Sequence, residues 1–384
     1  MGQALEGITV VDFSHVVAGP LATHFLALNG ARVIKIEQPT GDPLRNYTAN
    51  RDQAGMAPAF KGINLGKESV VLDLKSKHGH AEAKRLVAQA DIVVENFRPG
   101  VMARLGLDYD TLRADNPGLI YCAVSGFGQT GAMCDVAAID QIVQSLSGVM
   151  TLSGMQDDPA MRVGFPIVDT FTGLLAAFAI QTALVQRDRG KGIGQCIDVA
   201  MLDASLVMLL SVVNPLLMAG ETPMRTGNRG FSRAPTADTF TCADGDITIG
   251  AVEDAQVVKL LEVLDLSHLL TDPAYATRIA RIENADAMHA VLARAFATRQ
   301  AKDWEARLQA VGLPAARVLN VEQALALPHL ADRDLIMNVQ GDRVLNAGFQ
   351  FRHDGPGINR GAPELGAHTD TTTKPPAPGQ RRRA

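Results

Sequence analysis

One carboxylate stands out because of the residues on either side of it. Asp169 lies between an apolar run at 165–168 and a longer apolar run at 174–185. The first run is typical of an extended segment and the second of a buried helix, so we expect Asp169 at a strand-to-helix junction. There it can cap the helix by accepting hydrogen bonds from first-turn N–H groups. Alternatively, it can act as a desolvated nucleophile or base above a ligand.

The elements before Asp169 alternate between strands and helices. Strands are predicted at 8–13, 32–37, 69–74, 91–96 and 119–124, with helices at 18–28, 77–89 and 101–105. This alternation predicts an α/β fold whose large domain is Rossmann-like, with a parallel sheet and right-handed crossovers. The turn at 14–19 reads SHVVAG, so the dinucleotide fingerprint G-x-G-x-x-G is absent. Ligands of such sheets bind at the carboxyl ends of the strands.

Two long helices are predicted after Asp169, at 170–187 and 200–219, with a strand at 195–199 between them. The segment GKGIG at 190–194 looks like a phosphate-binding loop, but no Gly-Lys-Ser/Thr follows, so we interpret it as a hairpin-like turn. The apolar runs at 174–185 and 204–219 are shorter than the roughly 20 residues that a membrane span needs. We therefore expect buried helices and no membrane contact.

A second, smaller α+β domain is predicted over 221–330. It begins with a polar linker at 221–235 and continues with a β-hairpin, formed by 238–241 and 247–251, and helices at 255–265, 285–297, 301–310 and 322–326. Two late strands, at 336–340 and 348–351, close the ordered part. The tail at 371–384 is rich in Thr, Pro and Arg, so we expect it to be disordered.

Charge and cysteine content argue against several classes of protein. The net charge is −5, so no basic surface is expected to bind a nucleic acid. The four cysteines are scattered without a CxxC pair, which favours reduced thiols in a cytoplasmic protein over a disulfide framework or a metal site. The first residues, MGQALEGITVVDF, lack a basic segment followed by an apolar one, so no secretory signal is expected.

A set of short motifs, taken in order, is similar to the class III coenzyme A transferases, the family of formyl-CoA, carnitine and succinyl-CoA-dependent dicarboxylate transferases. The resemblance covers about 5–370. Its motifs are AGP at 18–20, GARVIKIE at 30–37 with GD at 41–42, NLGK at 64–67, LDLK at 72–75, VENFRPG at 94–100, LGL at 105–107, SGFGQTG at 125–131, SG at 147–148, Asp169 with TG at 172–173, Gly192, Asp198 and LGAHTD at 365–370. Each motif is weak alone, but the ordered set is highly specific.

The resemblance implies that Asp169 is the catalytic nucleophile of a CoA-transferase. In that family the matching aspartate attacks a donor acyl-CoA, forming an aspartyl-acyl anhydride and then an aspartyl-CoA thioester that passes CoA to an acceptor acid. Both intermediates need a dry pocket, and N–H groups at the helix start are expected to stabilise the oxyanion. The implied partners are an acyl-CoA and a small carboxylic acid. CoA is then a substrate, and neither a tightly bound cofactor nor a metal is implied.

The same resemblance implies that nine residues line the CoA site, together with a segment near 136–139. They are His15, Val17, Ala18, Leu72, Lys75, Asn96, Phe97, Arg98 and Arg104. Three of them are cations that suit the phosphates of CoA. Without the resemblance, these cations would be taken as solvated or ion-paired surface, and His15 as a turn histidine with satisfied hydrogen bonds.

Four departures from the family pattern bear on the acceptor acid. Val17 stands where the formyl-CoA branch often has Gln, and Gln38 stands where Arg is common. Ile139 lies in DVAAID at 135–140, which replaces the usual Arg-x-Gly-aromatic-Asp, and the glycine-rich loop of the small domain reads GAVED at 250–254. A succinyl-CoA donor with a dicarboxylic or hydroxy acid acceptor is expected only because that pairing is common in the family.

Three other functions stay open. The α-methylacyl-CoA racemases share the fold but use an Asp–His pair, and Ile139, which stands at the position of that histidine, cannot carry a proton. A non-catalytic acyl-CoA-binding protein of the same fold is the second possibility. The third is an acyl-CoA hydrolase, in which water completes the reaction at Asp169.

The resemblance also implies an interlocked homodimer. Its large domain is built from 1–220 and from a return segment at 331–370. The active site of the family lies between the large domain of one chain and the small domain of the other. The family's last helix, which follows the motif at 365–370, is replaced here by Thr and Pro residues.

Overall fold

The structure is a computed structural model that describes residues 2–230 and 232–372, and it divides into two compact units. The large unit contains the residues up to Met150, Arg162–Glu221, and the described residues from Pro328 onward. The small unit contains Thr151–Met161 and Thr222–Leu327. The segment 151–161 thus belongs to the small unit, although the sequence placed it in the first domain. It is tied to the linker, because the Gly227 N–H donates to the Gly154 carbonyl oxygen (3.1 Å).

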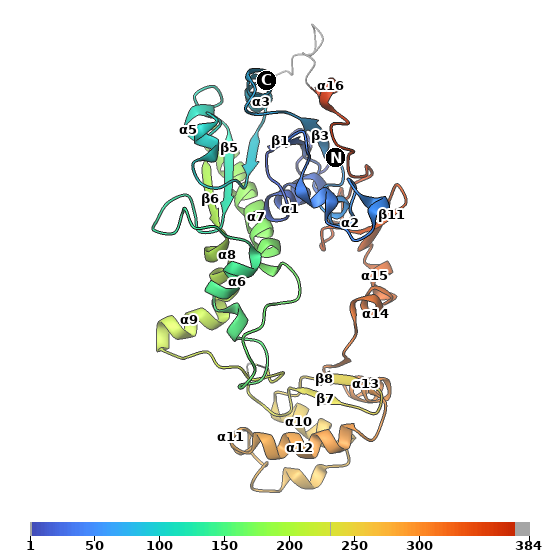
Figure 1. The fold of residues 1–384 in the computed structure, drawn as a ribbon. Coiled ribbons are helices and arrows are strands. Elements are labelled where there is room, and N and C mark those ends of the chain that lie inside the picture. Colours follow the sequence, from blue (N-terminus) through green and yellow to red (C-terminus); the bar gives the residue numbers. More distant parts are fainter. Residues whose placement is uncertain (1, 231, 373–384) are drawn as a thin grey trace. The chain divides into compact units, whose positions relative to one another are not determined.

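A six-stranded parallel sheet forms the centre of the large unit, in the order β3-β2-β1-β4-β5-β6 (Figure 1). Its strands are β1 (Thr9–Asp12), β2 (Arg32–Glu37), β3 (Glu68–Val71), β4 (Ile92–Glu95), β5 (Ile120–Ser125) and β6 (Cys196–Ala200). In the register of β1, Val10 lies opposite Val33 on one side and Ile92 on the other. The predicted α/β class with a parallel sheet is therefore confirmed.

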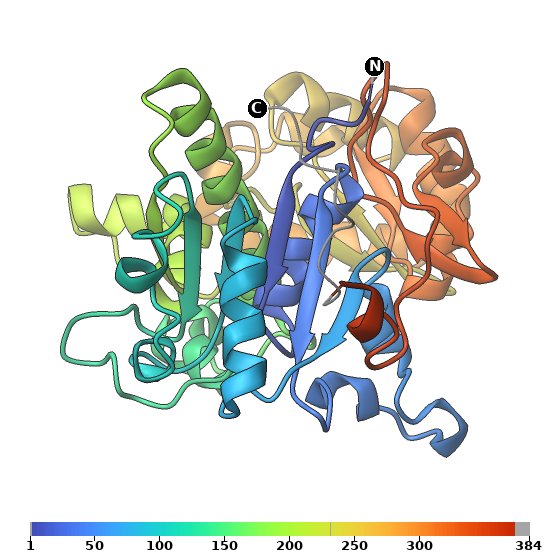
Figure 2. The same ribbon diagram turned by 90° about the horizontal axis from the view of Figure 1, so that it is seen from above.

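Helices cover both faces of this sheet. α1 (Ala18–Leu28) and α7 (Ile167–Arg189) pack on one face, and α3 (Lys77–Val87), α4 (Val101–Arg104) and α5 (Tyr109–Leu112) pack on the other. Figure 2 shows α3 in front of the strands. Adjacent side chains of β1 point to opposite faces of the sheet: Val10 packs under α1 and α7, and Val11 packs under α3. A strand covered on both faces is apolar throughout, which explains the continuous hydrophobic runs in the sequence.

The helices after residue 166 differ from the prediction. α7 has 23 residues, so by length and composition alone it is able to cross a membrane, and the expectation of a shorter helix is wrong. Its buried residues, such as Ala176 and Ile180, belong to the core under the sheet. The predicted helix 200–219 is a pair, α8 (Met201–Met208) and α9 (Leu210–Ala219), bent by 81°. The bend lies at Leu209, and Pro215 is inside α9.

The glycine-rich segment at 190–194 leads into a parallel strand, because β6 pairs with β5 in parallel. The expectation of a hairpin-like turn is therefore wrong. Gly194 donates its N–H to the Pro117 carbonyl oxygen (2.9 Å), and a side chain at this position would collide with the Leu119 carbonyl. Glycine is needed here because two backbone segments approach each other closely.

The short elements outside the central layers are single turns or little more. They are η1 (Pro43–Asn46), η2 (Arg51–Gln53), α2 (Pro58–Gly62), α6 (Asp140–Leu146), η3 (Val149–Thr151) and α15 (His329–Asp332).

The last described segment packs along the edge strand β3. β10 (Ile336–Val339) and β11 (Asp342–Leu345) form a separate antiparallel pair, so the strand predicted at 348–351 is wrong. Ser69 donates its N–H to His368 Nδ1 (3.2 Å) and Val71 donates its N–H to Thr369 Oγ1 (3.0 Å), which covers the open edge of β3. α16 (Thr369–Thr372) includes the start of the tail predicted to be disordered, and 373–384 lie outside the described residues.

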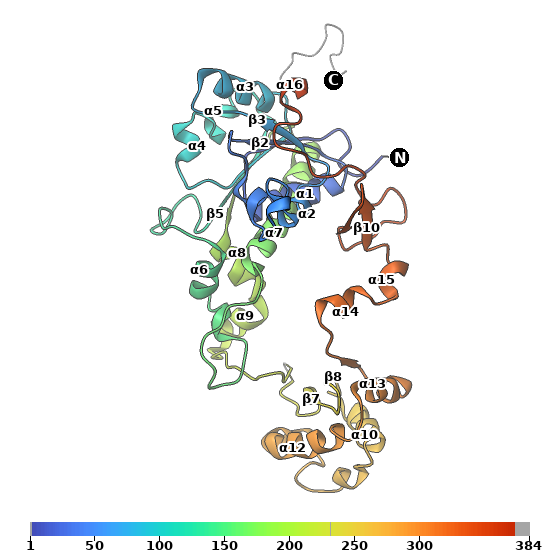
Figure 3. The same cartoon turned by 45° about the vertical axis from the view of Figure 1, so that its right-hand side comes forward.

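The small unit has its own sheet and core (Figure 3). β7 (Thr239–Thr241) and β8 (Asp246–Ile249) form the predicted hairpin, and β9 (Ala315–Arg317) pairs with β8. The helices are η4 (Ser267–Leu270), α10 (Asp254–Val263), α11 (Arg278–Glu283), α12 (Ala285–Phe296), α13 (Ala301–Ala310) and α14 (Val321–Leu325). Phe240 stacks on Phe296 at 4.8 Å, and Trp304 Nε1 donates to the Phe296 carbonyl oxygen (2.8 Å). The predicted α+β character is confirmed, while α11 and β9 were not predicted.

Candidate active site

A cavity of about 680 Å³ opens at the carboxyl ends of β1 to β4 in the large unit. Its walls come from the loops that follow these strands, with lining residues within 13–15, 35–43, 72–75 and 97–105. The strand order reverses between β1 and β4, and open parallel sheets bind their ligands at such a reversal. The cavity is therefore the ligand site that the topology favours.

Five of the nine predicted CoA-lining residues line this one cavity. They are His15, Leu72, Lys75, Phe97 and Arg104, and they come from the segments after three different strands, β1, β3 and β4. Leu72 is buried, whereas Lys75 and Arg104 are exposed. The cavity thus combines an apolar floor with cations that face solvent, an arrangement that suits a long ligand with an anionic end.

The other four predicted residues lie beside the lining. Asn96 holds the backbone of His15, accepting its N–H (2.9 Å) and donating to its carbonyl oxygen (2.8 Å). Val17 is the residue that precedes α1, and Ala18 is the buried first residue of that helix. Arg98 is exposed in the turn after β4. The structure therefore assigns Asn96 a contact to the protein backbone that the sequence did not indicate.

His15 and Phe97 form one wall of the cavity. Their ring centroids lie 5.2 Å apart in a tilted arrangement. Burial lowers the pKa of His15 below its ordinary value of 6.5, so the imidazole is neutral at pH 7. The wall is accordingly a flat and uncharged surface, of the kind against which a base or an apolar chain packs.

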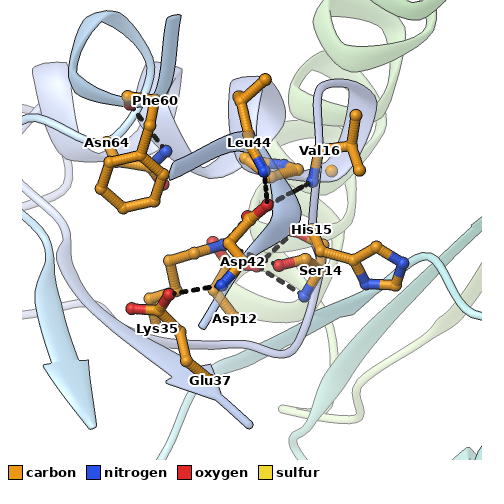
Figure 4. A network of polar contacts seen from close by, with 12 residues as sticks. Asp12, Ser14, His15, Val16, Lys35, Glu37, Asp42, Leu44, Phe60 and Asn64 are labelled. Carbon is orange, nitrogen blue, oxygen red and sulfur yellow. Dashed lines mark hydrogen bonds and ion pairs between the residues drawn. The ribbon is translucent and has the colours of Figure 1, made fainter. Parts of the chain in front are cut away.

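A network of buried charges adjoins the cavity (Figure 4), and three of its members, Lys35, Glu37 and Asp42, help to line it. Lys35 pairs with Asp42 (2.9 Å), Lys67 with Asp12 (3.1 Å) and Arg45 with Glu37 (2.7 Å), and each of these side chains is at most 2% exposed. This network was not predicted from the sequence. Lys35 in the predicted strand RVIKIE could have indicated it, because a charged side chain inside a fully buried strand must be paired with an opposite charge.

Three members of the network, Asp12, Lys35 and Lys67, are charged at neutral pH. Burial alone would raise the pKa of Asp12, but Lys67 and Lys35 outweigh burial and hold that pKa at about 2. Burial lowers the pKa of Lys67 to about 8, against the attraction of Asp12. Burial also lowers the pKa of Lys35, but Asp12 and Asp42 outweigh it and the net shift is upward. Removing one partner would leave a buried charge uncompensated.

Asp169 lies in the first turn of α7 and is partly buried. The residue before the helix is Pro166, so the expectation that Asp169 is the helix cap is wrong, as is the extended run at 165–168. Asp140, at the start of α6, takes the capping role: its Oδ2 accepts the N–H of Val168 (2.9 Å) and of Asp169 (3.1 Å). These two N–H groups were expected to stabilise an oxyanion, but in the structure they donate to the Asp140 carboxylate instead.

Asp169 is a carboxyl group with a strongly shifted pKa. Burial, with a smaller contribution from the Asp140 charge, raises this pKa from 3.8 to about 7. Asp140 is itself held by Gln144, whose Nε2 donates to Asp140 Oδ1 (2.5 Å) and whose Oε1 accepts the Val163 N–H (2.9 Å). A fixed neighbouring charge and a dry setting thus keep Asp169 from being stabilised as an anion.

Gly173 packs the helix of Asp169 against the start of α1, which follows the turn that carries His15, although Asp169 is not itself among the residues that line the cavity. A Cβ at this position would lie 2.7 Å from the Ala18 carbonyl oxygen, so α7 approaches the start of α1 as closely as backbones allow. Asp169 lies one turn earlier in α7, and the turn that carries His15 immediately precedes α1. Close packing therefore fixes the carboxyl group relative to the wall of the cavity.

The departures from the family pattern fall at different places. Gln38 lines the cavity, and Ile139 is 58% exposed directly before Asp140. The segment 250–254 belongs to the small unit, where the Gly250 N–H donates to the Pro314 carbonyl oxygen (2.9 Å). In the part of the chain that the structure describes, no three His, Cys, Asp or Glu side chains are grouped to hold a metal ion.

Comparisons with known proteins agree with this geometry. A family model described as CoA-transferase family III matches residues 5–369. The chain is 37% identical to an acetyl-CoA:oxalate CoA-transferase of Acetobacter aceti, over 94% of this chain and 92% of that protein. It is 36% identical to a succinate–glutarate CoA-transferase of Agrobacterium fabrum, over 88% and 86%. A crystal structure of a CaiB/BaiF family protein from Brucella suis superposes with a TM-score of 0.88 at 33% identity, covering 96% of this chain and 98% of the other.

Proposed function

The chain belongs to CoA-transferase family III and is a CoA-transferase, and we propose that it moves CoA from an acyl-CoA to a small carboxylic acid through Asp169. The observation that carries the proposal is the setting of Asp169, a partly buried carboxyl group whose pKa is raised to about 7. A carboxylate that is poorly solvated and poorly hydrogen-bonded is a stronger nucleophile than one in water.

In the proposed first half-reaction, an Asp169 carboxylate oxygen attacks the thioester carbonyl carbon of the donor. The carbon–sulfur bond breaks, and CoA leaves as a thiolate with the electron pair. The thiolate then attacks the Asp169 carbonyl carbon of the anhydride, which releases the donor acid and leaves an aspartyl-CoA thioester. Attack by the acceptor carboxylate reverses the sequence, regenerates Asp169 and yields the new acyl-CoA, with no net uptake or release of protons.

Asp140 supports this chemistry in two ways. It occupies the α7 N–H groups that would otherwise stabilise the carboxylate of Asp169. Its charge also contributes to the raised pKa of Asp169. Both effects raise the free energy of the ionised nucleophile, and the proposed anhydride and thioester carry no charge on Asp169. The penalty therefore disappears as the covalent bond forms.

The acyl-CoA is proposed to bind in the cavity at the ends of β1 to β4. Lys75 and Arg104 face solvent at the cavity and suit its phosphates, and Arg98 is proposed to assist from the next turn. Leu72 and the wall of His15 and Phe97 suit its apolar parts, with Asn96 holding the wall in place. Val17 and Ala18 are proposed to contact the ligand where α1 begins.

A dicarboxylic acid is proposed as the acceptor, with succinyl-CoA as donor. Support comes from relatives whose names specify oxalate and glutarate. Val17, Gln38, Ile139 and the loop at 250–254 are proposed to select among such acids, because these positions differ from the family pattern.

The enzyme is further proposed to be an interlocked homodimer in the cytoplasm. Within the large unit, Phe178, Leu217 and Met218 are 66%, 76% and 85% exposed, and large apolar side chains this exposed are of the kind that a partner chain covers. The four cysteines are free, as in a reducing compartment. Light scattering of the purified protein tests the dimer, and a monomer at micromolar concentration would contradict it.

The proposed reaction is tested with a panel of acyl-CoA donors and acceptor acids, read by mass spectrometry. Trapping with hydroxylamine should convert Asp169 to a hydroxamate, and borohydride should reduce the aspartyl-CoA thioester at the same residue. Full transfer activity in the Asp169→Ala variant would refute the nucleophile. Exchange of an α-proton for deuterium without an acceptor would indicate a racemase, and CoA release without an acceptor would indicate a hydrolase.

A further inference from the structure

The turn between β1 and α1 contains a strained residue. Val16 has a φ of 66°, which lies in the left-handed region. A β-branched side chain is disfavoured there, because its Cβ substituents crowd the backbone. Val16 follows His15, which lines the cavity, and precedes Val17, from which α1 starts. Such a conformation persists only where the surroundings hold it in place.

One buried ion pair holds the two peptide groups that flank His15, the second of which carries the Val16 N–H. The two carboxylate oxygens of Asp42 lie 3.2 and 3.3 Å from the Val16 N–H nitrogen, which donates to them. Lys35 pairs with Asp42 (2.9 Å) and donates from Nζ to the Ser14 carbonyl oxygen (2.7 Å). The side chains of Lys35 and Asp42 are 0% and 1% exposed. Figure 4 shows these groups converging on the turn from β2 and from the loop after it.

The backbone of His15 is also held by hydrogen bonds to the Asn96 side chain. It accepts the His15 N–H (2.9 Å) and donates to the His15 carbonyl oxygen (2.8 Å), so the peptide groups on both sides of His15 are fixed. Asn96 directly precedes Phe97, the ring that faces His15 across 5.2 Å. Asn96 therefore links the His15 and Phe97 rings of the cavity wall. Its two hydrogen bonds to the His15 backbone form only while the turn between β1 and α1 keeps the observed conformation.

We propose that the Lys35–Asp42 ion pair is a positioning device for acyl-CoA binding: it holds Val16 in its strained conformation and so pre-forms the His15 wall of the cavity. The inference rests on the proposed function, in which acyl-CoA occupies this cavity. Without the ion pair, Val16 relaxes to negative φ, the His15 carbonyl turns away from the Asn96 amide that now holds it, and the imidazole moves away from Phe97. Ligand binding then has to restore the turn, and affinity falls.

A double-mutant cycle tests the coupling. Asp42→Asn removes the charge that holds Val16 and should weaken the binding of free CoA, measured by calorimetry on the intact protein, about tenfold. In the Val16→Gly background the left-handed turn is no longer strained, so the same Asp42→Asn change should weaken binding only about twofold. Equal losses in the two backgrounds would overturn the proposal.

Val16→Gly alone separates positioning from general stability. Glycine relieves the strain but lets the turn sample other conformations, so the Tm should stay the same or rise while CoA affinity falls about threefold. A purely structural role would lower Tm and affinity together, and that result, or an unchanged affinity, would overturn the proposal. This variant keeps the test decisive if Asp42→Asn does not fold.

The matched control is Asp91→Asn. Asp91 also accepts a backbone N–H, from Thr9 (2.9 Å), and also pairs with a cation, Arg187 (3.2 Å), but it lies at the amino ends of the strands, away from the cavity. Its CoA affinity should equal that of the wild type, and a tenfold loss there would overturn the proposal.

Amide hydrogen exchange supplies a readout that does not depend on CoA. Protection of the Val16 N–H should be lost in Asp42→Asn and kept in Asp91→Asn, and retained protection in Asp42→Asn would overturn the positioning role. If the wild-type protein does not bind CoA, the proposed function fails instead, and the exchange experiment still decides whether Asp42 holds the turn.

Discussion

Removal of the Asp169 carboxyl group should abolish transfer activity and at the same time stabilise the fold. Its pKa is raised from 3.8 to about 7, first by burial and then by the Asp140 charge. The folded protein therefore keeps this proton to a higher pH than the unfolded chain does. Below about pH 4 both states are protonated and the group has no effect on stability. As the pH rises to about 7, ionisation favours the unfolded chain and stability is lost.

The size of this effect follows from the shift. About three pH units separate the two pKa values, and each unit corresponds to about 1.36 kcal/mol, so the penalty reaches about 4 kcal/mol above pH 8. Asn has the shape of a protonated Asp and no charge at any of these pH values. The Asp169→Asn variant should therefore be more stable than the wild type by about 4 kcal/mol at pH 8 and by less than about 1 kcal/mol at pH 4.

Thermal and urea unfolding of both proteins between pH 4 and pH 9 measure the difference. A gain of this size corresponds to a rise in Tm on the order of 10 °C at pH 8. The control is Asp115→Asn, because Asp115 is an exposed carboxylate of the same large unit, and this variant should show no comparable gain in stability at pH 8. The raised pKa of Asp169 would be refuted if Asp169→Asn were no more stable than the wild type at pH 8. It would also be refuted if the stability difference between the two proteins grew as the pH fell.

Three further outcomes are expected. The kcat/KM for transfer should rise with pH through about 7 as Asp169 ionises. Asp140→Asn should shift this rise to lower pH, since the Asp140 charge contributes to the raised pKa of Asp169. An unshifted pH profile in Asp140→Asn would count against a contribution from the Asp140 charge. Lys75→Ala and Arg104→Ala should each raise the KM for acyl-CoA about tenfold in initial-rate measurements, without changing the KM for the acceptor acid. Equal effects on both KM values would speak against phosphate contacts. Gly173→Ala should lower the free energy of unfolding by about 1–3 kcal/mol, because its Cβ would meet a carbonyl oxygen of α1 at 2.7 Å, and an unchanged urea midpoint would contradict this.

Local patterns were sufficient to predict the layered fold. The helix Ala18–Leu28 and the strand Arg32–Glu37 have the predicted bounds, because a Pro in the first helical turn, an Asn-Gly stop and a β-branched run are signals within a few residues. The hairpin of the small unit was predicted for the same reason. The strand at Asp342–Leu345 was missed, and its turn is formed by Gln340 and Gly341, both of which have positive φ. A Gln at such a position is not a recognised turn signal.

Residue patterns were thus enough to predict the α/β class, the family and Asp169 as the carboxyl group to examine. What surrounds that group depends on the tertiary structure. Asp140, which caps its helix and raises its pKa, is 29 residues away in the chain. Lys35 and Asp42 approach the strained Val16 from another strand and loop. Hydrogen bonds and charges act over a few ångströms in space, and residues distant in sequence meet at those distances only once the sheet has formed.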